Sequence, residues 1–101
     1  MTNSPTETAI ETGEVAKHGI RVTVTFSFSE KGPYQGRDGR STILGVVRKA
    51  AMEHFEADED PTHVFYLSHD RMRQEDSRTL GDVAGCEDAV TFRLVKELIQ
   101  G

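Results

Sequence analysis

Two stretches of the chain carry an apolar residue at every second position, with mostly polar residues between. Residues 20–29 place an apolar side chain at every second position from Ile20 to Phe28, with arginine, threonine and serine between them. Residues 89–95 repeat the pattern near the other end of the chain. A period of two indicates a β-strand with one buried face. The sequence therefore predicts a half-buried strand over each stretch.

The spacing of apolar residues changes to three and four positions over residues 41–55. This spacing predicts an amphipathic helix, with Ser41 or Thr42 as its N-cap and Val46 on its buried face. An acidic loop follows the helix, and Pro61 prevents it from continuing.

Shorter elements complete the pattern. We expect a weak strand within residues 33–38, a short strand around Phe65 and Leu67, and a helical turn over residues 78–85. One helix packed across a small mixed sheet would bury all the apolar faces at once, so the sequence predicts an α+β fold. The predicted core contains Val24, Phe26, Val46, Phe65, Leu80 and Phe92.

Length and charge narrow the class of protein. A chain of 101 residues forms a single small domain. Its 12 basic and 17 acidic residues give a net charge of −5, which argues against nucleic acid and anionic membranes as partners. No apolar run approaches the roughly 20 residues of a membrane span, and the N-terminus lacks the pattern of a secretory signal. Cys86 is the one cysteine, so we expect a soluble, monomeric protein of the reducing cytoplasm.

Composition divides the chain into three segments. Residues 1–18 are rich in threonine, glutamate and serine, and we expect them to form a flexible acidic arm. The folded domain is predicted over residues 19–97. A mobile tail is predicted over residues 98–101.

Motifs for metal binding and catalysis fail on inspection. The acidic stretch from Asp58 resembles a calcium loop at its first, third and fifth positions, but His63 and His69 stand where glycine and glutamate are required. The histidine spacing is not diagnostic of a metal site, and the sequence has no phosphate loop and no catalytic triad. We therefore expect no metal, no cofactor and no catalytic residue, and a protein that is not an enzyme.

Two strings in the second half of the chain resemble the ubiquitin family. FYLSHDRM and the following EDSRTLGD are similar to a strand, a turn and a Glu-Asp-Gly-Arg-Thr-Leu-Ser-Asp string of that family. The matching residues are Glu75, Asp76, Arg78, Thr79, Leu80 and Asp82. The order of elements over residues 20–101 also resembles the β-grasp fold. The resemblance implies a ubiquitin-like β-grasp domain, with one central helix on a small mixed sheet.

In this family the terminal glycine is the reactive residue. An activating enzyme adenylates its carboxylate and passes it to a cysteine as a thioester, which a target amine attacks. The resemblance places Gly101 at this position and implies a protein modifier joined through an isopeptide bond. Its implied partners are an activating enzyme, a conjugating enzyme or peptidase, and target proteins. Gln100 departs from the paired glycines of ubiquitin, and Glu97 reverses the charge that the ubiquitin-activating enzyme reads, so we expect a dedicated activating enzyme.

The resemblance also selects a docking surface. It places the apolar recognition patch of ubiquitin on Tyr66 and Val95, with Arg93 beside them. Scattered exposed apolar residues are ordinary, so a surface without function is the alternative. Two other functions stay open besides the modifier. One is a β-grasp interaction module that is never conjugated, and the other is a sulfur carrier with a C-terminal thiocarboxylate, against which Gln100 counts.

Overall fold

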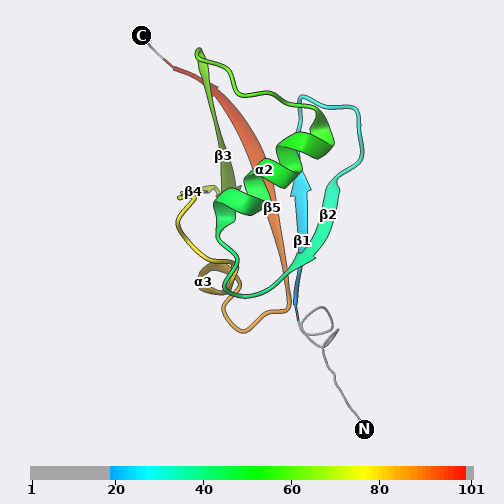
Figure 1. Ribbon diagram of the computed structural model, residues 1–101, viewed down its shortest axis with the longest axis vertical. Helices are drawn as coiled ribbons and strands as arrows, with labels where there is room; N and C mark the ends of the chain where they lie inside the picture. The colour runs from blue at the N-terminus through cyan, green and yellow to red at the C-terminus, as the bar shows by residue number, and fades with distance from the viewer. Residues whose placement is uncertain (1–18, 100–101) are drawn as a thin grey trace, which may run out of the picture.

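The computed structural model describes residues 19–99. The predicted arm over residues 1–18 and the last two residues, Gln100 and Gly101, lie outside the described residues. No helix within the described range is long and apolar enough to cross a membrane. The elements in chain order are β1 Ile20–Thr25, β2 Tyr34–Asp38, α2 Leu44–Phe55, β3 His63–His69, β4 Met72–Gln74, α3 Leu80–Ala84 and β5 Ala89–Leu98 (Figure 1).

The strands form one mixed sheet in the order β2-β1-β5-β3-β4. β1 and β5 are parallel neighbours, and the other neighbouring pairs are antiparallel. Helix α2 lies across one side of the sheet (Figure 1). We call this side the inner side and the opposite one the outer side. The arrangement confirms the predicted α+β architecture of one central helix on a small mixed sheet.

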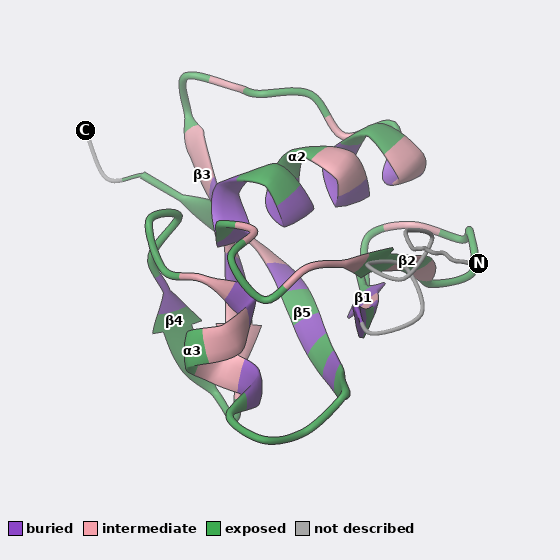
Figure 2. Ribbon diagram, turned by 60° about the horizontal axis from the view of Figure 1, so that its bottom comes forward, coloured by how far each residue is buried: buried purple, intermediate pink, exposed green. Residues whose placement is uncertain are grey.

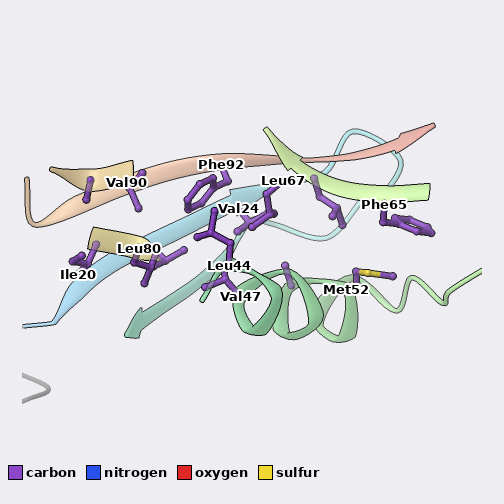
Figure 3. Packing of buried hydrophobic residues seen from close by; sticks show 14 of the residues in the cluster. Ile20, Val24, Leu44, Val47, Met52, Phe65, Leu67, Leu80, Val90 and Phe92 are labelled. Carbon is purple, nitrogen blue, oxygen red and sulfur yellow. The ribbon is translucent and has the colours of Figure 1, made fainter. Parts of the chain in front are cut away.

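The core lies between α2 and the inner side of the sheet. Side chains from both layers point toward one another (Figure 3), and Leu44, Leu67 and Phe92 are at most 1% exposed. Burying a side chain of this size contributes roughly 1.5–3 kcal/mol. Most of the predicted core is confirmed. Of the predicted residues, Val24, Phe65, Leu80 and Phe92 are buried, and Phe26 is partly buried and packs against the core.

The first turn of α2 is capped by the backbone of a distant loop. Ile43 occupies the N-cap position and makes no side-chain cap. The first two helical N–H groups donate to the carbonyl oxygens of Arg78 and Asp76, at 2.8 and 3.0 Å. These carbonyls satisfy donors that the start of a helix leaves unpaired. The predicted cap at Ser41 or Thr42 is therefore wrong.

The buried face of α2 also differs from the prediction. Val46 is 52% exposed, whereas its neighbour Val47 is completely buried. Buried positions recur at intervals of three and four from Leu44 to Phe55. The prediction that Val46 lies on the buried face is therefore wrong, because the apolar stripe of the helix runs through Leu44 and Val47.

β1 ends earlier than the alternation of its sequence suggests. The strand stops at Thr25, and a turn follows in which the Ser29 N–H donates to the Phe26 carbonyl at 3.3 Å. Phe26 packs beside Phe55, with ring centroids 5.4 Å apart, but Phe28 is 71% exposed. The prediction that Phe28 continues the buried face is wrong, because the chain leaves the sheet before reaching it.

A tight hairpin that the sequence analysis missed joins β3 to β4. Asp70 and Arg71 adopt positive φ angles of 53° and 69°, as a two-residue hairpin turn requires. His69 and Met72 face each other across this turn. The turn lacks the glycine that marks most such hairpins, so the stretch reads as a polar loop.

The predicted helical turn near residues 78–85 is present as α3. The Asp82 N–H donates to Thr79 Oγ1 at 3.1 Å, and the Thr79 N–H donates to the Asp82 carboxylate at 3.3 Å. This reciprocal cap satisfies two donors that would otherwise lack a partner. Gly85 ends the helix with a φ of 62°, which glycine adopts without steric cost.

Candidate functional site: the outer side of the sheet and the C-terminal strand

The outer side of the sheet carries the residues that the sequence predicts to bind partners. Consecutive side chains of a strand point to opposite sides, so the residues that flank the buried Leu94 face outward. Tyr66 of β3 and Val95 of β5 form a cross-strand pair there, and both are half-buried. Arg93 and Glu97 lie on the same side of β5 and are exposed. The structure brings the four residues together, and their role in binding stays a prediction.

Arginine side chains surround the Tyr66–Val95 pair. The guanidinium carbon of Arg73 lies 4.7 Å from the ring centroid of Tyr66, a favourable placement of a cation over an aromatic face. Ser68 pairs with Arg73 across one edge of β3 and with Arg93 across the other. Arg93 pairs in turn with Thr25 of β1. A row of arginine and hydroxyl side chains therefore crosses the sheet from β4 to β1.

A hollow of about 300 Å³ opens beside this row. The residues that line it include Thr25, Tyr66, Ser68, Arg71, Arg93 and Val95. We call it the arginine hollow. Its lining combines charged and hydroxyl-bearing residues, Asp70 among them, with the aromatic residue Tyr66 and the apolar residue Val95. Such a combination suits one polar side chain of a partner next to one apolar side chain.

Charge is distributed unevenly between the two sides of the molecule. The charged strand residues on the outer side are Arg21, Arg37, Arg73 and Arg93, together with Glu97. The end of α2 and the loop after it contain Glu53, Glu56, Asp58, Glu59 and Asp60. The outer side of the sheet is therefore basic, although the whole chain has a net charge of −5.

The C-terminal strand continues further than predicted. β5 runs to Leu98, which pairs with His63, and the Ile99 N–H donates to the Thr62 carbonyl at 2.8 Å. Leu98 and Ile99, which the sequence analysis assigned to a mobile tail, therefore pair with His63 and Thr62. The added pairing consists of backbone hydrogen bonds to a distant segment, so no side-chain pattern signals it.

Asp60 stabilises the turn that leads into β3 and presents this carbonyl. Its carboxylate accepts hydrogen bonds from the Thr62 N–H, at 2.7 Å, and from the Thr62 hydroxyl, and its second oxygen lies 3.3 Å from His63 Nδ1. The hydrogen bonds from Thr62 lower the pKa of Asp60 below its usual value, and His63 adds a smaller effect. The turn that receives Ile99 is thus held by an ionised carboxylate.

A buried arginine joins α2 to the segment after β4. Arg48 donates to both carboxylate oxygens of Asp76, at 3.0 and 2.9 Å, and to Glu59 at 3.1 Å. The hydrogen bond to Asp76 is the main cause that raises the pKa of Arg48 above its usual value. A planar guanidinium matches a carboxylate in this bidentate geometry. Because the cluster links two elements of the core, we assign it to stability, and the sequence analysis did not find it.

The other side chains that could bind a metal ion or react chemically do not form a cluster. Within residues 19–99 no group of three or more histidine, cysteine, aspartate or glutamate side chains gathers in a way that could hold a metal ion. His54 Nε2 lies 2.9 Å from the Gly32 carbonyl, and the ring of His69 packs beside Phe92 with centroids 5.9 Å apart. Cys86 is an exposed thiol in the loop before β5.

Arg71 and Arg73 are the residues of the outer side that the sequence analysis missed. In their string DRMRQ the two arginine residues are separated by one position, which is the spacing of side chains on the same side of a strand. Without a predicted β4 no side of the sheet could be assigned to them.

No protein-family model and no curated protein sequence matches this chain. Solved structures do resemble it. The ubiquitin of Caldiarchaeum subterraneum has a TM-score of 0.64 and 17% identity, over 82% of this chain and 99% of that chain. ATG8 of Trypanosoma brucei has a TM-score of 0.63 and 9% identity, over 88% and 87% of the two chains. A protein described as a molecular mimic of SUMO that promotes DNA repair has a TM-score of 0.60 and 12% identity, over 77% and 91%. At such identities the likeness establishes the fold, and the chain has the ubiquitin-like β-grasp fold.

Proposed function

We propose that this chain is a ubiquitin-like protein modifier, activated at the carboxylate of Gly101 and joined to an amine of a target protein. The observation that carries the proposal is the course of β5. This central strand leads the chain out of the sheet at Leu98, three residues before Gly101. A carboxylate that reacts in the active site of another enzyme has to lie beyond the body of its own domain, and the end of β5 at Leu98 supports this proposal.

The chemistry needs no catalytic side chain from this chain. Attack of the Gly101 carboxylate on ATP forms an acyl adenylate and releases pyrophosphate. A cysteine thiol of the activating enzyme then displaces AMP and forms a thioester. A target amine attacks the thioester carbonyl, forms an amide bond and releases the thiol. A terminal glycine supports this role, because it lets the enzyme approach the backbone closely.

The pairing of β5 with β3 limits the reach of the reactive end. An extended chain spans at most about 3.5 Å per residue, so two residues beyond Ile99 can span at most about 7 Å. Separating residues 97–99 from β3 adds about 10 Å. One backbone hydrogen bond, such as that from Ile99 to Thr62, contributes only about 0.5–1.5 kcal/mol. We infer that an activating enzyme separates this end of β5 when it binds.

The outer side favours the proposal that the partner proteins are dedicated to this chain. Glu97 is exposed and follows Val95 on that side, so a partner enzyme needs a basic group opposite it. Tyr66, Val95 and Arg93 would provide the docking surface for that enzyme, for a conjugating enzyme or peptidase, or for proteins that read the attached modifier. The proposal includes a monomeric, cytoplasmic protein with no catalytic residue of its own.

The test is activation of the full chain by its cognate enzyme with ATP. Mass spectrometry should detect an adenylate or a thioester at Gly101. Deletion of Gly101 should abolish both products without changing the unfolding midpoint, because the residue follows the last strand. Gly101→Ala should slow activation, since its methyl group crowds the backbone that the enzyme grips. The matched control is Gln100→Ala, which should be activated almost as fast as the unaltered chain.

The alternative function is an interaction module that is never conjugated. The strand pairing as far as Ile99 favours it, because it shortens the free end. Two outcomes would favour the interaction module over the modifier. One is attachment of the Gly101 deletion as efficient as that of the full chain, and the other is no adenylate with the cognate enzyme. A thiocarboxylate formed at Gly101 with ATP and a sulfur donor would identify a sulfur carrier instead.

A further inference from the structure

We propose that the arginine hollow binds a carboxylate side chain from an acidic peptide segment of a partner protein, with a neighbouring apolar residue of that segment on Tyr66 and Val95. The inference names the chemistry of the partner for the docking surface of the proposed function, and it rests on that function only for what the binding achieves. Peptide binding itself needs neither ATP nor Gly101.

Several residues with hydrogen-bond donor groups line the hollow together. Arg71 and Arg93, whose side chains end in guanidinium groups, line it together with Thr25 and Ser68, whose side chains carry hydroxyl groups. A guanidinium group binds both oxygens of a carboxylate in one plane, and hydroxyl groups can donate to the remaining lone pairs. The volume of about 300 Å³ suits a side chain rather than a large ligand.

The arginine residues of this site have no charged partner among the residues that the structure describes. Within residues 19–99, Arg71, Arg73 and Arg93 form no ion pair and no side-chain hydrogen bond, whereas Arg48 is fully engaged with two carboxylates. Asp70 also lines the hollow, but its side chain is 89% exposed and lies 3.9 Å from His69. The site therefore attracts an anion without first breaking a bond of its own.

The shape of the basic surface favours a peptide over a nucleic acid. A nucleic acid binds through a run of phosphate contacts along a continuous basic stripe. Here Tyr66, Val95 and Glu97 interrupt the arginine residues, and the net charge of −5 repels a long polyanion. A short segment with alternating acidic and apolar residues matches both parts of the surface.

Binding of a synthetic peptide to the full chain tests the proposal. The probe is an acetylated twelve-residue peptide with glutamate at alternate positions around one leucine, and its control carries glutamine at every glutamate. Amide chemical shifts in a ¹⁵N-labelled sample should move around Tyr66, Ser68 and Arg93 with the acidic peptide only. Affinity should fall as salt rises, because screening weakens exposed charge pairs.

Two charge-neutralising variants locate the site. Arg93→Gln should weaken binding of the acidic peptide roughly tenfold, as expected for the loss of one charged hydrogen-bonding group. The matched control Lys49→Gln removes an exposed positive charge from α2 and should change the affinity less than about twofold. Arg93 is exposed, and the amide spectrum of the variant checks that its fold is kept.

Three results would overturn the proposal. The glutamine peptide could bind equally well, Lys49→Gln could weaken binding as much as Arg93→Gln, or only a phosphoserine version of the peptide could bind. The Gly101 deletion should bind the peptide normally, so failure of conjugation with intact peptide binding refutes the modifier alone. Intact conjugation without peptide binding refutes the acidic partner alone.

Discussion

Neighbouring residues of the same strands build two different surfaces on this sheet. In β5, Phe92 points toward α2 and is 1% exposed, whereas Arg93 points away from α2 and is exposed. Figure 2 shows the resulting alternation as buried and exposed bands along β5. The inner side needs apolar side chains that fill the space under α2, so it decides whether the chain folds. The outer side needs little beyond strand-forming residues, so substitutions in its arginine row should change the stability little.

The largest difference in stability should appear between alanine substitutions of two neighbouring residues on opposite sides of β5. Phe92→Ala should lower the free energy of unfolding by about 3–5 kcal/mol, because it leaves a cavity in the centre of the core. Arg93→Ala should change it by no more than about 0.5 kcal/mol, because the side chain is exposed. Urea unfolding followed by circular dichroism measures both values. Equal midpoints for the two variants would show that the two sides are wrongly assigned.

The helix offers the same comparison between two valines. Val47→Ala should lower the free energy of unfolding by about 2 kcal/mol, from the loss of two buried carbon groups and the small cavity that remains. Val46→Ala should change it by no more than about 0.5 kcal/mol, because this side chain is 52% exposed and alanine favours the helix slightly. Thermal unfolding of both variants measures the difference. A larger loss for Val46→Ala would restore the buried face that the sequence predicts.

Arg48 sharpens the comparison because it is a charged residue buried on the helix side of the sheet. Asp76→Asn should lower the free energy of unfolding by about 1–2 kcal/mol, since it leaves the guanidinium without its bidentate partner. The effect stays modest because the Asp76 side chain is 52% exposed and water screens the pair. Glu59→Gln is the control, with a smaller loss expected because Glu59 is 68% exposed. Equal losses in urea unfolding would contradict the leading role of Asp76.

Much of the fold follows from local patterns in the sequence. The alternation over residues 20–25 and 89–95 identifies the central strands, because one side of each is buried and the other is not. The string from Glu75 to Asp82 identifies α3 and its cap, and it carries the family resemblance. These features depend on residues close together in the chain.

The missed features depend on contacts between distant segments. The alternation through Phe28 does not show that the strand leaves the sheet at Thr25. The start of α2 depends on carbonyl groups of the 76–78 segment, which no cap residue signals. The pairing of Ile99 with Thr62 involves backbone atoms alone. The candidate site was predicted in part, through Tyr66 and its neighbours on β5, whereas the arginine residues near β4 required the hairpin to be known.

The last comparison concerns Tyr66, the centre of the outer side, where we expect a smaller loss of stability than at Phe92 or Val47. Tyr66→Ala removes the aromatic face under Arg73 and the contact with Val95. An exposed cation–aromatic pair contributes about 0.5–1 kcal/mol and a cross-strand pair about 0.2–1 kcal/mol, so the free energy of unfolding should fall by about 1 kcal/mol. The affinity for the acidic peptide should fall several-fold, because the apolar part of the surface is lost. Tyr66→Phe keeps the ring and should preserve both quantities. Urea unfolding and peptide titration of both variants in parallel separate folding from recognition. A Tyr66→Ala variant that unfolds would place Tyr66 in the core. A variant that binds the peptide normally would exclude Tyr66 from the docking surface.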